Sequence, residues 1–292
     1  MKILIADAFD ANLPERLKKF GEVSSDASAL SSAEVVLVRS KTKCTKEYMD
    51  QAPSLKLIIR GGVGTDNIDK EAAKAKGVEV KNTPKASSPA VAELAFAMLI
   101  AIPNKLIEAH NSMKEGKFLK SEIKRTELLG KTLGLIGVGR IGTELARRAG
   151  AFGMRVIGMD KFVTQSDVVE LKTLDEVLAQ ADYLSLHTPL MDETKGMINK
   201  ATIAKMKDGV AIVNTGRGKC VVEEDLVEAL KSGKVKAYAT DVWYSDPPDP
   251  SCPLLTAPNV IMAPHLGAST KENLLRIGNE VVELLEAYQK KK

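Results

Sequence analysis

Three glycines and one aspartate carry the clearest chemical signal in this chain. An apolar run that begins at Thr132 leads directly into Gly137-x-Gly139-x-x-Gly142, and Asp160 ends the next apolar run. The first glycine permits a tight turn, the second lets the backbone approach a pyrophosphate, and the third lets the following helix pack on the strand. Asp160 is spaced to accept hydrogen bonds from both ribose hydroxyls. A glycine turn without a ligand is the alternative, but strand, helix and acid together predict a dinucleotide site.

A second group of candidate catalytic residues follows three later apolar runs. Arg217, Asp246 and His265 each come just after one of these runs. Parallel strands place their carboxyl ends at one edge of a sheet, so we expect the three side chains to converge on a bound nicotinamide ring. Taken singly, each has a simpler explanation. Arg217 would be a surface cation, Asp246 a turn-forming residue before Pro247, and His265 an imidazole with its hydrogen bonds satisfied near a helix N-terminus. A guanidinium, a carboxylate and an imidazole at one sheet edge together favour catalysis.

The elements that must position these residues are apolar strands alternating with helical patterns, which is typical of parallel α/β sheets. The first expected group of strands is Lys2–Asp7, Val35–Ser40, Leu55–Arg60 and Val78–Thr83. The second is Thr132–Gly137, Arg155–Asp160, Tyr183–Thr188, Val210–Thr215, Lys236–Val242 and Asn259–Pro264. The predicted fold class is therefore α/β, with two doubly wound parallel-sheet domains, the larger being a Rossmann dinucleotide-binding domain.

The joins between the domains are marked by turn and cap residues. Ser87-Ser88-Pro89 precedes a helix expected over Ala90–Ile102 and stopped by Pro103. Gly267-Ala-Ser269 precedes a last helix, in which Ser269 and Glu272 form a predicted capping box. The last helix also carries an apolar stripe that needs a partner surface, made of Leu274, Ile277, Val281, Leu284 and Leu285.

If that stripe packs on the first domain, the chain crosses between the domains twice. The expected domains are then 1–88 plus 267–292, a flavodoxin-like substrate-binding domain, and 89–266, a Rossmann domain that binds NAD. Hinges are expected near Ser88 and Gly267, with the substrate cleft between the domains.

Length and composition argue against several classes of protein. The chain has 292 residues, 44% of them hydrophobic and 27% charged, which suits a globular protein of about two domains. No apolar run approaches the roughly 18 residues of a membrane span, and the net charge of +4 is small, so neither a membrane nor a nucleic-acid partner is expected. The three cysteines lack metal-ligand spacing, which favours reduced thiols and no metal. Asp7 interrupts the N-terminal apolar run, so we expect no signal peptide and a cytoplasmic location.

Several segments give the chain a family resemblance over essentially its whole length. They are Val38–Thr45, Arg60–Asp69, Asn82–Pro84, Gly137–Gly142 with Asp160, Leu186–Leu190, Asn214–Gly218 and Pro264–Thr270. With them the chain resembles the D-isomer-specific 2-hydroxyacid dehydrogenases, and most closely the D-3-phosphoglycerate dehydrogenases. The resemblance implies NAD-dependent hydride transfer from a 2-hydroxy acid, in a homodimer formed through the segment after Pro103.

The resemblance also implies a role for each matching residue. His265 would be the general acid/base, Arg217 the anchor of the substrate carboxylate, and Asp246 the partner of His265. Asp241 would meet the nicotinamide carboxamide, and His187-Thr188-Pro189 would line the adenosine side. The remaining cofactor contacts implied are Gly137, Gly139, Arg140, Ile141, Gly142, Asp160, Thr215 and His265. The implied substrate contacts are Arg39, Arg60, Gly62, Val63, Arg217 and His265, with Arg39 and Arg60 on the 3-phosphate.

The favoured reaction oxidises D-3-phosphoglycerate to 3-phosphohydroxypyruvate, as in serine biosynthesis. Reduction of glyoxylate, hydroxypyruvate or another 2-oxo acid is the alternative, because it needs the same catalytic residues and less positive potential. A corepressor that senses NADH is a more remote alternative.

The chain departs from the family pattern in two places. Asp246 stands where the family usually has the longer Glu, which leaves the rate and the pH optimum open. The sequence ends at Lys292, where larger phosphoglycerate dehydrogenases continue into a regulatory domain, so feedback inhibition by serine is not expected.

Overall fold

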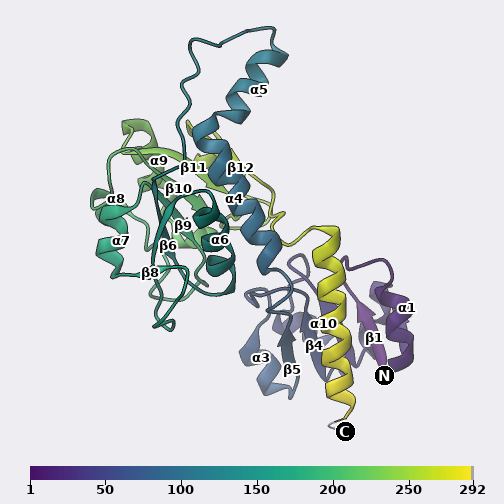
Figure 1. Ribbon diagram of the computed structural model, residues 1–292. Helices are drawn as coiled ribbons and strands as arrows, with labels where there is room; N and C mark the ends of the chain where they lie inside the picture. The colour runs from purple at the N-terminus through teal and green to yellow at the C-terminus, as the bar shows by residue number, and fades with distance from the viewer. Residues whose placement is uncertain (291–292) are drawn as a thin grey trace. The chain divides into compact units, whose positions relative to one another are not determined.

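The computed structural model describes residues 1–290, which form two compact units (Figure 1). One unit comprises Met1–Ala90 together with the C-terminal segment from Ala268, and the other comprises Val91–Gly267. The chain therefore passes from one unit to the other twice. Each unit is built on a parallel sheet with helices, so the predicted fold class is confirmed.

The first unit holds a five-stranded parallel sheet in the order β2-β1-β3-β4-β5, which is the flavodoxin-like order. Its strands are β1 (Lys2–Ile5), β2 (Glu22–Ser24), β3 (Val35–Val38), β4 (Leu57–Arg60) and β5 (Glu79–Asn82). Strand β3 is buried along its whole length, and this explains its unbroken apolar sequence. The edge strand β2 was not predicted, because only Val23 of its three residues is apolar.

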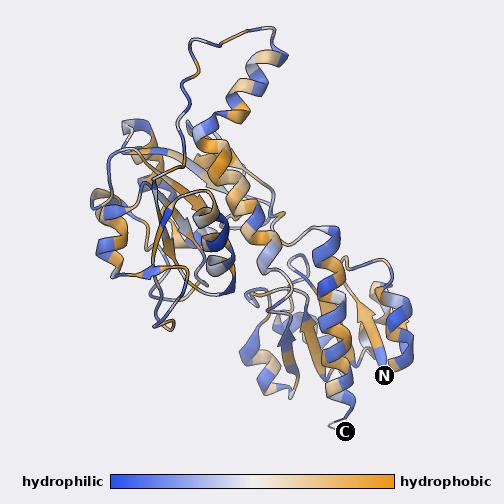
Figure 2. Ribbon diagram, in the orientation of Figure 1, coloured by the Kyte–Doolittle hydropathy of each residue, from blue (hydrophilic) through white to orange (hydrophobic). Residues whose placement is uncertain are grey.

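The last helix packs against the sheet of the first unit. Ile277, Val281 and Leu285 of α10 (Lys271–Gln289) are completely buried, in one cluster with residues of β1, β3 and β4. Figure 2 shows the resulting division of α10 into an apolar and a hydrophilic side. The remaining helices of this unit are α1 (Leu13–Leu17), α2 (Lys46–Asp50) and α3 (Lys70–Ala75). The apolar stripe thus has the partner surface that the sequence predicted.

The predicted capping box at the start of α10 is wrong by one residue. The hydroxyl of Thr270, not that of Ser269, caps the helix, accepting a hydrogen bond of 3.1 Å from the Asn273 N–H. Ser269 and Thr270 have the same capping chemistry, so the local sequence could not decide which residue starts the helix.

The second unit holds a seven-stranded parallel sheet in the order β12-β11-β10-β9-β6-β7-β8. Its strands are β6 (Thr132–Ile136), β7 (Arg155–Met159), β8 (Glu170–Leu171), β9 (Tyr183–Leu186), β10 (Val210–Asn214), β11 (Val235–Thr240) and β12 (Val260–Met262). Strands β8-β7-β6-β9-β10-β11 reproduce the 3-2-1-4-5-6 order of the Rossmann fold, and β12 adds a seventh strand. The prediction of six strands missed β8, which has only two residues.

Helix α4 (Ser88–Asn104) supplies much of the core of the second unit, where Ala92, Ala95 and Leu99 are completely buried. The prediction that Pro103 stops this helix is wrong. Pro103 lies in the last turn, where its missing N–H costs a single hydrogen bond, and the helix ends at Asn104, just before the left-handed Lys105 (φ 51°). The other helices of the unit are α5 (Leu106–Lys114), α6 (Arg140–Ala151), α7 (Leu174–Gln180), α8 (Lys200–Ala204) and α9 (Glu223–Ser232).

Helix α5 differs from the other helices of its unit. It projects away from the sheet, and the chain returns from it in a long loop (Figure 1). Leu106, Ile107 and Met113 are each more than half exposed. Within residues 1–290 no single helix is long and apolar enough to cross a membrane, and α4 and α5 would qualify only as a pair bent by 65°.

Candidate active site

The glycine-rich turn between β6 and α6 has the geometry of a phosphate cradle. Gly137 has a φ of 99°, and a Cβ there would lie 2.8 Å from the backbone of His187. A Cβ at Gly142 would lie 2.2 Å from the Gly137 carbonyl oxygen, so this residue lets α6 pack on the strand. At Gly139, the N-cap of α6, no heavy atom lies within 4 Å of such a Cβ. The residues present therefore fit a dinucleotide whose pyrophosphate approaches the helix N-terminus.

Asp160 lies directly beside this turn. Its Oδ2 accepts a hydrogen bond of 2.8 Å from the Val138 N–H, and its Oδ1 accepts from Phe162 and Val163 at 2.8 and 3.1 Å. The adjacent cation, Lys161, bonds Glu193 at 2.8 Å. The carboxylate is thus held in a fixed position at the end of β7, and the nearest lysine in the sequence is engaged elsewhere.

The segment after β9 packs against the same turn. His187 Nε2 lies 2.9 Å from the Ser185 hydroxyl, and burial lowers the pKa of His187 to about 4, so its ring is neutral. His187 Nδ1 is buried and has no hydrogen-bond partner within residues 1–290. Because the His187 backbone contacts Gly137, the His187-Thr188-Pro189 segment borders the phosphate cradle.

Arg217 follows β10 in a loop that is tightly packed. Its Nη1 donates to the Gly216 carbonyl at 2.7 Å. A Cβ at Gly218 would lie 2.4 Å from the Trp243 carbonyl carbon, so the loop is pressed against the segment that follows β11. Thr215, at the base of the loop, is buried. Close backbone packing at Gly218 therefore constrains the loop that carries Arg217.

His265 and Asp246 form a pair. His265 Nδ1 hydrogen-bonds Asp246 Oδ2, and both side chains are partly exposed. The Asp246–Pro247 peptide is cis, and His265 is one of three described non-glycine residues with a positive φ, at 57°. The contact shows that the shorter aspartate reaches the imidazole without the extra methylene of glutamate. With Nδ1 engaged by Asp246, Nε2 is the nitrogen left to exchange a proton with a substrate.

The buried Asp241 supports the segment that carries His265. Its two carboxylate oxygens accept hydrogen bonds from the N–H groups of Leu266 and Gly267, at 2.6 and 2.7 Å. Burial raises the pKa of Asp241, and these two N–H donors and the nearby imidazole oppose that rise. Strands β10, β11 and β12 are neighbours, so Arg217, Asp246 and His265 follow three adjacent strand ends, with Asp246 and His265 in direct contact.

In the first unit, Arg39 follows β3 and is half-buried. Its Nη2 donates to the Ala268 carbonyl at 2.9 Å and its Nη1 to the Ala8 carbonyl at 3.4 Å. Burial lowers the pKa of Arg39, and the nearby Asp7 opposes that effect. The two hydrogen-bond acceptors of the Arg39 side chain, the Ala8 and Ala268 carbonyls, are neutral and do not neutralise a guanidinium, so the group is suited to an anion.

Arg60 ends β4, the strand next to β3, and Val38 pairs with Arg60 in the ladder. A Cβ at Gly62 (φ 146°) would lie 1.7 Å from Arg60 Nη1, so the guanidinium occupies space that only glycine leaves open. Asn82 donates to the Val63 carbonyl at 2.6 Å, and this bond holds the loop that Gly62 and Val63 form.

Sequence reasoning missed two residues that fix the Arg39 loop. Asp7, at the end of the first strand, accepts hydrogen bonds from the Arg39 N–H at 2.5 Å and from the Thr42 hydroxyl at 2.7 Å. Asn67 donates to the carbonyls of the same two residues, at 2.7 and 2.6 Å. Asp7 follows a strand just as Arg217 does, so the rule that strand ends carry chemistry could have found it.

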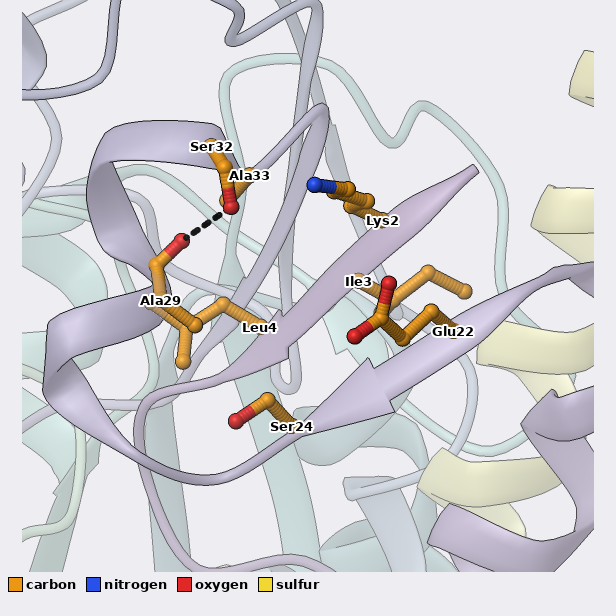
Figure 3. Close-up of a pocket in the computed structure, with 8 residues that line it drawn as sticks. All are labelled: Lys2, Ile3, Leu4, Glu22, Ser24, Ala29, Ser32 and Ala33. Atoms are coloured by element: carbon orange, nitrogen blue, oxygen red, sulfur yellow. Dashed lines mark hydrogen bonds between the residues drawn. The ribbon is translucent and has the colours of Figure 1, made fainter.

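The described residues of the first unit line a small cavity and larger grooves, one of them beside Val63 and Asn82. A cavity of about 20 Å³, with room for about one water molecule, lies between β1, β2 and the 3-10 helix Ala27–Ser32, and Figure 3 shows the residues that line it. A groove of about 460 Å³ lies at the carboxyl end of β1 and includes Asp7, Asp10 and Lys41. In the described part of the chain, no group of three or more His, Cys, Asp or Glu side chains is arranged to hold a metal ion.

Comparisons with known proteins agree with this geometry. Residues 96–267 match the family D-isomer specific 2-hydroxyacid dehydrogenase, NAD binding domain. A hydroxypyruvate reductase of Thermotoga maritima is 48% identical over 87% of this chain and 84% of its own length. A D-3-phosphoglycerate dehydrogenase of Methanocaldococcus jannaschii is 42% identical over 98% of this chain, which spans only 57% of that relative. Among solved structures, a D-lactate dehydrogenase of Aquifex aeolicus with NAD and lactic acid has a TM-score of 0.87 at 33% identity, over 99% of this chain and 95% of that one.

The chain thus belongs to the D-isomer-specific 2-hydroxyacid dehydrogenase family. It is an NAD-dependent oxidoreductase, and its second unit contains the NAD-binding domain of that family.

Proposed function

We propose that this enzyme oxidises D-3-phosphoglycerate to 3-phosphohydroxypyruvate with NAD. The observation that carries this proposal is the pair of guanidinium groups, Arg39 and Arg60, at the ends of the neighbouring strands β3 and β4. Two cations at one sheet edge suit a phosphate dianion, and relatives about 40% identical over nearly the whole of this chain are named D-3-phosphoglycerate dehydrogenases. This reaction would place the enzyme in serine biosynthesis.

In this proposal Arg217 binds the substrate carboxylate through a forked pair of hydrogen bonds and so fixes the orientation of C2. NAD, when bound, accepts the hydride from C2. His265 Nε2 takes the proton of the C2 hydroxyl, and in the reverse direction the imidazolium returns it to the carbonyl oxygen. The hydrogen bond between His265 Nδ1 and Asp246 holds the ring in one orientation and leaves Nε2 facing the substrate hydroxyl in this proposal.

The proposed cofactor contacts surround the turn after β6. Gly137, Gly139 and Gly142 leave room for the pyrophosphate, and Asp160 accepts from the adenosine ribose. Asp241 would bind the nicotinamide carboxamide with its remaining acceptor capacity, because a carboxylate oxygen can accept a second hydrogen bond besides the one from Leu266 or Gly267.

A second candidate function is the reduction of hydroxypyruvate or glyoxylate. It is favoured by the hydroxypyruvate reductase of Thermotoga maritima, whose 48% identity exceeds the 42% of the phosphoglycerate dehydrogenase described above. Both functions use the same Arg217 and His265 chemistry and differ in whether a phosphate must be bound.

We also propose that the enzyme is a cytoplasmic homodimer in which α5 meets its counterpart in a second copy. The exposed apolar side chains of α5 and of the loop after it, including Leu106, Ile107, Met113 and Phe118, support this assignment, because exposed apolar clusters of this kind mark interfaces. A Leu106→Lys/Ile107→Lys variant that sedimented as the unsubstituted protein does would contradict it.

The substrate is tested by measuring NADH absorbance with a panel of substrates. We expect kcat/KM to be highest for 3-phosphohydroxypyruvate in the direction of reduction, ahead of hydroxypyruvate, glyoxylate and pyruvate. A higher value for hydroxypyruvate would select the second candidate function. Binding of NADH without turnover of any member of the panel would contradict both and favour a cofactor-sensing role.

A further inference from the structure

Asn214, at the end of β10, is completely buried and bonds three groups around the arginine loop. Its Nδ2 donates to the Arg217 carbonyl at 3.0 Å and to the Tyr238 hydroxyl at 3.2 Å. Its Oδ1 accepts from the Gly216 N–H at 3.1 Å. The side-chain amide therefore fixes the backbone on both sides of the Gly216–Arg217 peptide.

The backbone of Asn214 is connected by hydrogen bonds to the segment that carries His265. The Asn214 carbonyl accepts a hydrogen bond of 3.0 Å from the Asp241 N–H. The Asp241 carboxylate in turn accepts from Leu266 and Gly267, the two residues that follow His265. A continuous and largely buried set of hydrogen bonds thus connects the backbone of Arg217 with the backbone beside His265.

We propose that Asn214 and Tyr238 are positioning residues for the reaction, which hold the Arg217 loop in register with the His265 segment. This inference rests on the roles proposed above for Arg217 and His265. Neither Asn214 nor Tyr238 touches a reacting atom in this scheme. Their task is to keep a guanidinium and an imidazole, carried by different loops, at a constant separation.

The chemistry of the two side chains suits this task. An amide offers both a donor and an acceptor, so a single orientation of Asn214 satisfies the Gly216 N–H and the Arg217 carbonyl together. Tyr238 is only 1% exposed, and burial raises its pKa to about 12, so it presents a neutral hydroxyl. That hydroxyl accepts the second N–H of the amide and removes the freedom of Asn214 to turn away. In a buried site each of these bonds is costly to leave unmade, so the arrangement resists displacement.

The sharpest test compares two single-atom deletions. Tyr238→Phe removes the hydroxyl that restrains Asn214 and keeps the buried ring. Tyr183→Phe is the matched control, because Tyr183 is also 1% exposed and lies on the same sheet, but at the start of β9, away from the strand ends that carry the site. A third variant, Asn214→Asp, keeps the acceptor for Gly216 and replaces the donor that holds Arg217 with an oxygen.

Steady-state reduction of hydroxypyruvate by NADH should separate the variants. We expect Tyr238→Phe to lower kcat/KM by about tenfold, mainly through KM, and Asn214→Asp to lower it by about 10²-fold, which is the scale of a 1 Å misplacement. Inhibition by oxamate, an unreactive carboxylate, should weaken in parallel, while NADH binding measured by fluorescence stays within twofold. Tyr183→Phe should leave all of these constants unchanged.

A double substitution shows whether the effect passes through the arginine. In an Arg217→Lys background, Asn214→Asp should cause less than a threefold further loss, because residues that act through one another are not additive. Full additivity, or equal constants for Tyr238→Phe and Tyr183→Phe, would overturn the inference. If the proposed roles of Arg217 and His265 are themselves wrong, the result differs from this one, because the Arg217→Lys and His265→Ala variants would then retain near-normal turnover.

Discussion

Asp160 should make the enzyme select NAD over NADP. The carboxylate is held by three N–H donors, from Val138, Phe162 and Val163, and cannot easily swing away from a ribose bound beside it. A 2′-phosphate would bring negative charge to within a few ångströms of it. Lys161 bonds Glu193, which limits its ability to offset the repulsion.

The size of the effect follows from Coulomb's law. Two unit charges 4 Å apart interact by about 4 kcal/mol at the effective dielectric constant of a site near the protein surface. Since about 1.4 kcal/mol corresponds to a factor of ten, each unit of negative charge on the 2′-phosphate at this distance would disfavour NADP by about 10³ before screening. Asp160 is partly exposed, and salt weakens the repulsion, so we expect a preference for NAD of about 10²–10³ in kcat/KM at low ionic strength.

Asp160→Ala separates the two tasks of this residue. Loss of the negative charge should raise kcat/KM for NADP, while loss of the bond to Val138 should loosen the glycine turn and lower kcat/KM for NAD. The preference should therefore shrink to about tenfold or less. Asp167→Ala is the control, because it removes an exposed carboxylate from the segment after β7 and leaves the ribose position untouched.

The assay is the reduction of each cofactor, followed by absorbance, over a range of salt concentrations. Equal kcat/KM for NAD and NADP in the unsubstituted protein would refute the reasoning. So would an unchanged preference in Asp160→Ala, because the discrimination would then come from another residue.

Four further predictions follow from the site. His265→Ala should lower kcat by about 10²–10⁴ with NADH binding by fluorescence almost intact; near-normal kcat would mean that another group carries the proton. Asp246→Asn should lower kcat/KM for carbonyl reduction, because His265 Nδ1 then faces an uncharged amide in place of the carboxylate that orients the ring; an unchanged kcat/KM would show that the pair has no role. Replacing Arg39 and Arg60 by Ala should lower kcat/KM for 3-phosphohydroxypyruvate by about 10²–10⁴ and for hydroxypyruvate far less, whereas equal losses would remove the support for a phosphate site. Burial lowers the pKa of His187 below its unfolded value, so its contribution to stability is present above pH 6.5 and is lost as the pH falls towards 4. The free energy of unfolding of the cofactor-free protein, obtained from melting curves, should therefore fall by about 2 kcal/mol more between pH 7 and 5 than that of a His187→Asn variant. Equal decreases in the two proteins would contradict this.

Much of the fold could be predicted from the sequence because each buried strand leaves a local pattern of apolar residues. Buried parallel strands such as β3 and β10 are continuous apolar runs, since both of their faces are covered. The strands that were missed, β2 and β8, are short strands at the sheet edges, where one neighbour is absent and little apolar sequence is needed. The start of α10 was misplaced for a different reason, because two adjacent hydroxyl residues could each cap it.

The sequence by itself determined the elements of the site whose chemistry depends on residue type and spacing. The spacing of the three glycines predicts a tight turn, in which Gly137 has a positive φ and Gly142 has no room for a Cβ, and Asp160 stands at a set distance from them. Arg217, Asp246 and His265 were found because parallel strands bring their carboxyl ends to one edge.

Only the tertiary structure decided which groups hold these residues in place. The family resemblance already implied that Asp246 pairs with His265, but it gave no sign of the bond from Asn214 to Tyr238, which joins neighbouring strands through 24 residues of chain. Such contacts leave no local pattern, because an asparagine or a tyrosine in an apolar strand looks the same whether its polar atoms meet a partner or not. The physical reason is that burial makes these hydrogen bonds obligatory, and which groups are buried together is a property of the folded chain.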